Sequence, residues 1–93
     1  MIKKTPVKGT KTVKVTFTLP KDRPGTKVSV VGDFNGWNPL SHPLRPRSNG
    51  TRSVQVPLPA GQRYAFRYLG EGGQWLNDET ATELEGDNSV LHT

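Results

Sequence analysis

The sequence has no cysteine, few aromatic residues and no long hydrophobic run. Without cysteine, neither disulfide bonds nor a thiolate metal site can hold the fold together. No stretch approaches the roughly 20 apolar residues that a membrane-spanning helix needs, and the basic start, residues 1–14, is followed by no signal-peptide-like segment. We therefore expect a soluble, cytoplasmic protein with one modest core, no metal and no cofactor.

Helical patterns are also absent, and alternating patterns take their place. No window of eleven or more residues repeats apolar positions at helical spacing, and ten glycines and eight prolines interrupt the chain. Alternation of apolar and polar residues instead predicts short strands. The strands are expected at residues 12–19, 27–33, 54–58, 64–68, 74–76 and 89–92, with turns at 20–25, Asn49-Gly50, Ala60-Gly61 and 71–73. This pattern predicts an all-β fold, an immunoglobulin-like antiparallel β-sandwich.

Acidic residues are scarce in most of the chain. Residues 1–70 carry all 13 Lys and Arg but only two acids, whereas residues 71–93 carry six acids and neither Lys nor Arg. Such a charge distribution suits nucleic acid, a membrane surface or an acidic protein as a partner. We favour a simpler interpretation, in which residues 1–10 are a flexible basic terminus, residues 11–93 form a single domain, and the remaining lysines solvate its first strand.

Residue patterns for catalysis are missing too. A glycosidase needs two carboxylates across a bound sugar, but Asp78 and Glu79 are sequence neighbours and are expected in a solvated loop. Ser41-His42 lacks an evident third member of a triad, and His92 lies near the end of the chain. These observations argue against an enzyme.

Two tryptophans are the most informative residues present. Trp37 follows the turn dipeptide Asn35-Gly36, and Trp75 follows Gly72-Gly73, so each is expected at the rim of a sandwich. Either could instead be a core tryptophan, but the other apolar residues suffice for a core of this size. An exposed indole is a flat apolar surface against which sugar rings or planar bases can pack.

Polar residues near these turns could complete a binding site. Arg67 lies on the face of its strand opposite Phe66 and Tyr68, where a guanidinium could donate paired hydrogen bonds to hydroxyl groups. Asn77 and Asn88 carry amides that both donate and accept hydrogen bonds. Each of the three could equally be an ordinary surface or turn residue.

Three segments in order, "VSVVGDFNGW", "LPAGQRYAFRYLGEGGQWLND" and "GDNSVL", resemble signatures of the family 48 carbohydrate-binding module, the isoamylase N-terminal or early-set domain. The resemblance covers residues 12–92. Members of that family precede the catalytic domains of α-glucan branching and debranching enzymes, or form the glycogen-binding domain of the β subunit of AMP-activated protein kinase.

The resemblance implies an early-set immunoglobulin-like sandwich and a site for α-1,4-glucan. By motif position, the implied sugar-binding residues are Trp37, Trp75, Arg67, Leu84 and Asn88. Arg67 stands where the family often has lysine, and the segment around Leu84 differs from the family in length. Ser89 is an alternative to Asn88 as the sugar-facing residue.

Three functions are therefore predicted, in order of preference. The first is a non-catalytic module that binds glycogen, starch or maltooligosaccharides. The second is an early-set domain that packs on a glucan-active enzyme or a regulatory protein and binds no sugar. The third, less favoured, is nucleic-acid binding by the basic N-terminal segment; no membrane partner is expected.

Overall fold

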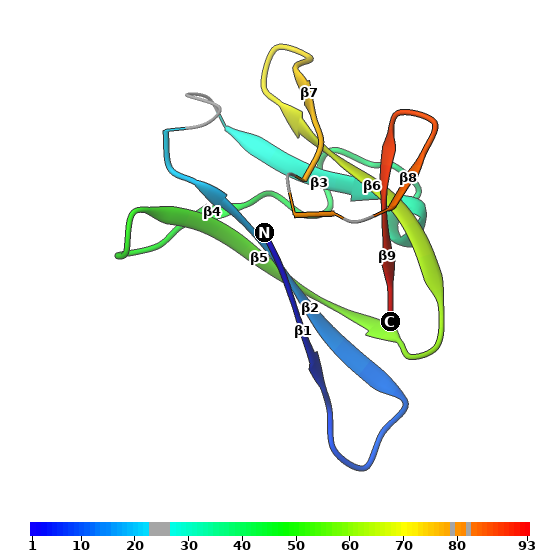
Figure 1. The fold of residues 1–93 in the computed structure, drawn as a ribbon. Coiled ribbons are helices and arrows are strands. Elements are labelled where there is room, and N and C mark those ends of the chain that lie inside the picture. Colours follow the sequence, from blue (N-terminus) through cyan, green and yellow to red (C-terminus); the bar gives the residue numbers. More distant parts are fainter. Residues whose placement is uncertain (23–26, 79, 82) are drawn as a thin grey trace.

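Two antiparallel β-sheets face one another in a sandwich, as the computed structural model in Figure 1 shows; it describes residues 1–22, 27–78, 80–81 and 83–93. One sheet has the strand order β1-β2-β5-β4 and the other β3-β6-β9-β8, with β7 also paired to β6. The strands of the first sheet are β1 (Ile2–Pro6), β2 (Thr12–Pro20), β5 (Thr51–Pro59) and β4 (Arg45–Pro46). Those of the second are β3 (Val28–Gly32), β6 (Arg63–Gly70), β9 (Asn88–His92), β8 (Glu83–Glu85) and β7 (Trp75–Leu76), and a 3₁₀ turn, η1 (Asp33–Asn35), follows β3. The sandwich confirms the predicted fold class.

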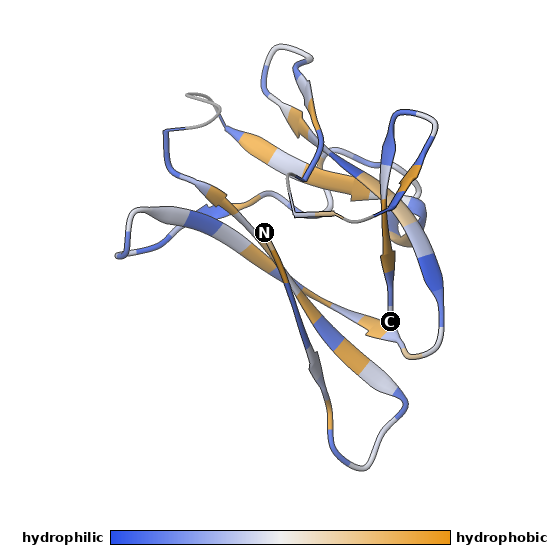
Figure 2. Cartoon of the chain, viewed as in Figure 1, coloured by the Kyte–Doolittle hydropathy of each residue, from blue (hydrophilic) through white to orange (hydrophobic). Residues whose placement is uncertain are grey.

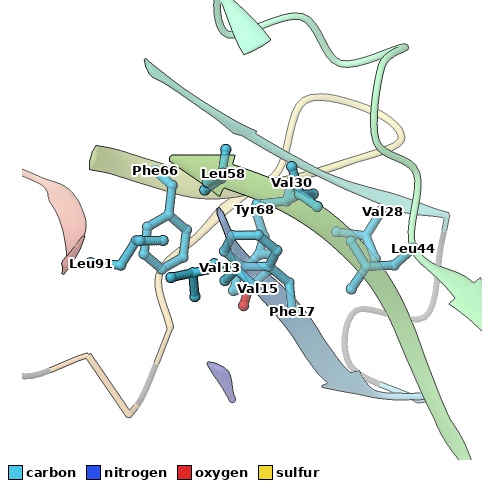
Figure 3. Packing of buried hydrophobic residues seen from close by; sticks show 11 residues of the cluster. Val13, Val15, Phe17, Val28, Val30, Leu44, Leu58, Phe66, Tyr68 and Leu91 are labelled. Carbon is cyan, nitrogen blue, oxygen red and sulfur yellow. The ribbon is translucent and has the colours of Figure 1, made fainter. Parts of the chain in front are cut away.

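The core fills the space between the sheets because alternate residues of the longer strands point inward. Figure 2 shows hydrophobic segments alternating with hydrophilic ones along β2. Phe17 from β2 and Tyr68 and Phe66 from β6 are fully buried and meet at the centre of this core (Figure 3). The predicted alternation at residues 13, 15 and 17 is confirmed, because these three are buried while Lys14 is exposed.

Part of the N-terminal segment, which was expected to be flexible, lies in a strand. Residues Ile2–Pro6 form β1, which pairs along its whole length with residues 13–17 of β2. Ile2 packs against the core, and the Lys4 ammonium donates a hydrogen bond to the His92 carbonyl in the other sheet, at 2.9 Å. The lysines of this segment suggested a frayed end. The Ile2 contact with the core and the backbone pairing with β2 nevertheless hold residues 2–6 in the sheet.

Strand β5 runs further than predicted, through two prolines. It continues to Pro59, with Pro57 opposite Lys14 of β2. Strand β4 pairs only with Arg52 and Ser53, so the rest of β5 is an edge on that side, where a residue without an N–H group is tolerated. The predicted turn at residues 20–25 lies in part outside the described residues.

The short elements β4, β8 and η1, of two or three residues each, were not expected from the sequence. Within the described part of the chain, no helix is long and apolar enough to cross a membrane.

Candidate functional site

The turn that carries Trp37 is built by hydrogen bonds from Asn35. The side-chain oxygen of Asn35 accepts a hydrogen bond from the Gly32 backbone amide at 3.1 Å. The side-chain amide group of Asn35 donates one to the Val30 carbonyl at 3.1 Å. Gly36 completes the turn in the left-handed region, with φ of 65°. Phe34 stacks on Phe17, with ring centroids 5.6 Å apart, and so anchors this turn to the core.

Trp37 is half-buried and lies outside the buried core cluster. Its backbone is left-handed, with φ of 60°, which is uncommon for a bulky side chain. The indole N–H donates to one oxygen of Asp33 at 3.2 Å, and the other oxygen of Asp33 accepts from the Ala65 amide at 2.9 Å. Asp33 therefore ties the ring to strand β6, a role that sequence reasoning missed although Asp33 precedes Trp37 by one turn.

Trp75 lies on the outer face of the second sheet, in β7. Trp75 pairs with Leu69 of β6. Because Tyr68 points inward, its neighbour Leu69 points outward, and so does Trp75 opposite it. The Trp75 side chain is 49% exposed. The Arg67 guanidinium lies over the Trp75 ring, 5.1 Å from its centroid. Such a cation–π contact stabilises an exposed pair by about 0.5–1 kcal/mol and restricts the motion of both side chains.

Arg67 is half-buried, and its Nε atom is buried with no hydrogen-bond partner among the residues that the structure describes. Only the terminal nitrogens of the guanidinium are therefore left to meet a ligand. The stack of Arg67 on Trp75 could not be foreseen from the sequence, because it depends on the register between β6 and β7.

Strand β6 relates the two tryptophans to one another. Trp37 is tied to it at Ala65 through Asp33, and Trp75 pairs with it at Leu69. Residues 65 and 69 point to the same face of the strand and are about 13 Å apart at the usual rise per residue. Arg67 lies midway between them on that face.

Asn88 and Ser89 lie on opposite faces of β9. Ser89 pairs with the inward-pointing Phe66 and is fully buried, where it donates to Asn77 Oδ1 at 3.2 Å. It therefore has no surface to offer a sugar. Asn88 is half-buried and points to the outer face, and one further step of the β6–β9 ladder brings it opposite Arg67.

Leu84 is the predicted site residue that the structure separates from the other predicted ones. It is 61% exposed in β8, but it pairs with the inward-pointing Ser89, so alternation directs it away from the face that carries Arg67 and Trp75. Strand β8 is the edge of its sheet. A ligand on the outer face would reach Leu84 only around that edge.

Asp78 was expected in a solvated loop, and this expectation is wrong. Its side chain is fully buried and accepts a hydrogen bond from the Tyr68 hydroxyl at 2.6 Å; the amino group of Met1 lies 2.9 Å from the same oxygen. The other oxygen accepts from the Thr80 amide at 2.8 Å. Asp78 is thus a buried structural residue within the β7–β8 connection, and Glu79 lies outside the described residues.

The buried Asp78 carboxylate makes stability depend on acid pH. Burial by itself would raise the pKa of Asp78, but hydrogen bonds from Thr80, Tyr68 and the Met1 amino group outweigh burial and hold the pKa below its ordinary value. Burial, together with the bond to Asp78, raises the pKa of the Tyr68 phenol, so the phenol stays the donor. Since the unfolded chain binds more protons than the folded one below about pH 4, this stabilisation is complete above that pH and is lost below it.

We predict that Asp78→Asn is less stable than the wild type at pH 7 and loses less stability between pH 5 and pH 2. Urea unfolding at several pH values measures both effects. Two curves that stay parallel down to pH 2 would show that Asp78 keeps its ordinary pKa in the folded protein. Thr93→Ala, which removes hydroxyl contacts at the end of the chain without removing a charge, controls for general loss of stability.

The end of β3 leaves no room for a side chain at Gly32. Its backbone is extended, but a Cβ atom there would lie 2.6 Å from the Ala65 carbonyl oxygen and 2.8 Å from the Phe34 ring. We expect Gly32→Ala to destabilise the fold by about 1–3 kcal/mol, the usual cost of overpacking, and to disturb the Asp33–Trp37 contact. Denaturant unfolding measures the loss. In Gly70→Ala the three atoms nearest the added Cβ belong to Gln74 and are 3.2–3.5 Å away, so an equal loss there would contradict this explanation.

The fold and these geometric features define a class of protein: an immunoglobulin-like antiparallel sandwich with a tryptophan–arginine pair on the outside of one sheet. Residues 23–83 match the family model of carbohydrate-binding module 48, the isoamylase N-terminal domain. That span is more than half of the chain, so the chain belongs to this family.

Curated relatives of the chain include 1,4-alpha-glucan branching enzymes. The chain is 54% identical over 51 residues to the enzyme GlgB of Deinococcus radiodurans, 49% to GlgB of Rhodopseudomonas palustris and 43% to GlgB 2 of Xanthomonas campestris pv. campestris. The matched segment covers 54% of this chain but only 7% of each of these enzymes. The chain is thus homologous to one small region of each branching enzyme.

Proposed function

We propose that this chain is a non-catalytic module that binds α-1,4-glucan on the outer face of the β3-β6-β9-β8 sheet. The observation that supports the proposal most is the Trp75 ring, half-exposed on that face and braced by Arg67. Membership of a carbohydrate-binding family and relatives named as glucan branching enzymes support the choice of sugar.

The chemistry of the face suits a neutral, hydroxyl-rich ligand. The apolar faces of sugar rings pack on indole, and the terminal nitrogens of Arg67 and the amide of Asn88 supply donors and an acceptor for hydroxyl groups. Trp37, tied to β6 by Asp33, is proposed as the second aromatic contact. Leu84 stays a prediction as a contact for longer glucans that pass around the β8 edge.

Binding to a single short oligosaccharide is expected to be weak. Trp75 lies half-exposed on the outer face of a sheet, and few groups hold the ligand, so we expect a Kd of about 1 μM to 1 mM. Because Trp75 is braced before binding, little ordering is needed. Glycogen, with many chain ends, gains apparent affinity through multivalency.

Calorimetric titration with maltoheptaose tests the proposal, and cellohexaose, which has β-linkages, is the control sugar. We expect saturable heat with maltoheptaose, retention by glycogen on co-sedimentation, and little change between 50 and 200 mM salt. Absence of both heat and retention would overturn the proposal.

The second candidate is a domain that packs on a glucan-active enzyme or regulatory protein without binding sugar. It is favoured by the relatives, in which the matching segment is a small part of a larger enzyme. The exposed Leu40, which lines a cavity of about 800 Å³ together with Val28, Leu44 and Leu69, offers an apolar contact for such a partner. Binding of a branching enzyme without any response to maltoheptaose would favour this candidate. The cytoplasmic location of this chain stays a prediction.

A further inference from the structure

The outer face of the β1-β2-β5-β4 sheet lies on the opposite side of the sandwich from β7, the strand that contains Trp75 (Figure 1). Because β1 is paired rather than frayed, Lys3 lies opposite Thr16 and Lys14 opposite Thr5, and all four point outward. Among the outward residues of this sheet, we define the basic face as Lys3, Thr5, Lys14, Thr16, Thr18, Arg45, Ser53, Gln55 and Pro57, with the Arg47 side chain against Ser53.

Positive charge on the basic face is not neutralised by nearby acids. Residues 1–21 and 34–70 contain neither Asp nor Glu, and these ranges include every strand of this sheet and the turns at 7–11 and 47–50. In the described part of the chain, Lys3, Lys14 and Arg45 make no ion pair. The acids gather instead in the second sheet, where Glu83 and Glu85 both pair with Arg63.

The cations are close enough to act together. Lys3 and Lys14 are diagonal neighbours on adjacent strands, about 7–8 Å apart. Arg45 lies three strands from Lys3, about 14 Å across the sheet at the usual strand spacing. Like charges at these distances repel one another, and a polyanion laid across the face relieves that repulsion.

We propose that the basic face binds the phosphate backbone of double-stranded nucleic acid, independently of base sequence. Lysine, arginine, threonine, serine and glutamine are the side chains that contact phosphates in such complexes. The face has no aromatic residue to stack unpaired bases, which disfavours single strands. It also lacks the apolar centre of a stable protein interface, which disfavours an acidic protein as the partner.

Fluorescence anisotropy with a labelled 20-base-pair DNA duplex of arbitrary sequence tests this proposal. If about four phosphates are neutralised, raising the salt from 50 to 200 mM weakens binding by about a hundredfold. Maltoheptaose at saturation leaves duplex binding unchanged, because the sugar is proposed to bind the opposite sheet. The two proposals can therefore fail separately.

Matched variants separate a local site from the effect of net charge. Lys3→Gln with Lys14→Gln is expected to weaken duplex binding at least tenfold, whereas Lys21→Gln with Lys27→Gln, which removes the same charge at one end of the sandwich, changes it less than threefold. All four lysines are exposed, so both variants are expected to fold. Equal weakening by the two pairs would overturn the proposal.

The remaining outcomes are equally decisive. Absence of duplex binding at 50 mM salt would overturn the proposal. Tighter binding of a single strand of the same sequence, or of poly-glutamate, would also overturn it, and the latter result would point to an acidic protein as the partner.

Discussion

Trp75→Ala lowers the affinity for maltoheptaose at least tenfold, about 1.4 kcal/mol of binding free energy, and leaves the fold intact. The ring is 49% exposed, so its removal costs the sandwich little packing, but it takes away the apolar surface on which we place the sugar. It also leaves Arg67 without the ring over which it lies. Calorimetry measures the affinity, and thermal unfolding checks that the variant is folded.

Two further variants show whether the ring itself is responsible. Trp75→Phe keeps a smaller flat ring and is expected to retain part of the affinity. Gln55→Ala changes an exposed residue on the opposite sheet and is expected to bind as the wild type does. Unchanged affinity in Trp75→Ala would remove Trp75 from the site.

Phe17→Ala is expected to produce the largest loss of stability, about 3–5 kcal/mol, through lost burial and a cavity at the centre of the core. The Phe17 ring is fully buried and contacts the rings of Phe34, Phe66 and Tyr68 at centroid distances of 5.6, 5.2 and 6.4 Å. Small domains are stable by only about 5–15 kcal/mol, so much of this margin disappears. Urea unfolding measures the change.

Leu19→Ala is the matched control for Phe17, because Leu19 belongs to the same strand but is only partly buried. We expect it to cost clearly less. A loss below about 1 kcal/mol in Phe17→Ala would contradict the packing described here. Since Phe34 packs on Phe17, the Phe17 variant is also expected to loosen the turn that carries Trp37.

The sheet strands with clear alternation were predictable, and the reason is physical. Inward positions such as Val13, Val15 and Phe17 must be apolar to fill the core, so the sequence carries the period of the strand. The turn at Asn35-Gly36 was predictable because few residues adopt a left-handed backbone.

Other features depend on contacts between distant segments and leave little local signal. The sequence of β1 predicts a charged terminus rather than a strand, because within β1 only Ile2 contributes an apolar contact to the core. The sequence around Asp78 predicts a solvated loop, because the hydrogen-bond partner that buries it, Tyr68, is ten residues away in strand β6. The orientation of Leu84 away from Trp75 follows from the β8–β9 register, which residue types alone do not specify.

The most direct test of the account follows the two indole N–H signals by NMR during titration with maltoheptaose. The account predicts that the signals of Trp75 and Trp37 both shift, saturate at one Kd, and do so together with backbone amides of β6 and β9. It is contradicted if neither indole signal moves while the sugar binds, or if the shifts fall on the β1-β2-β5-β4 sheet instead.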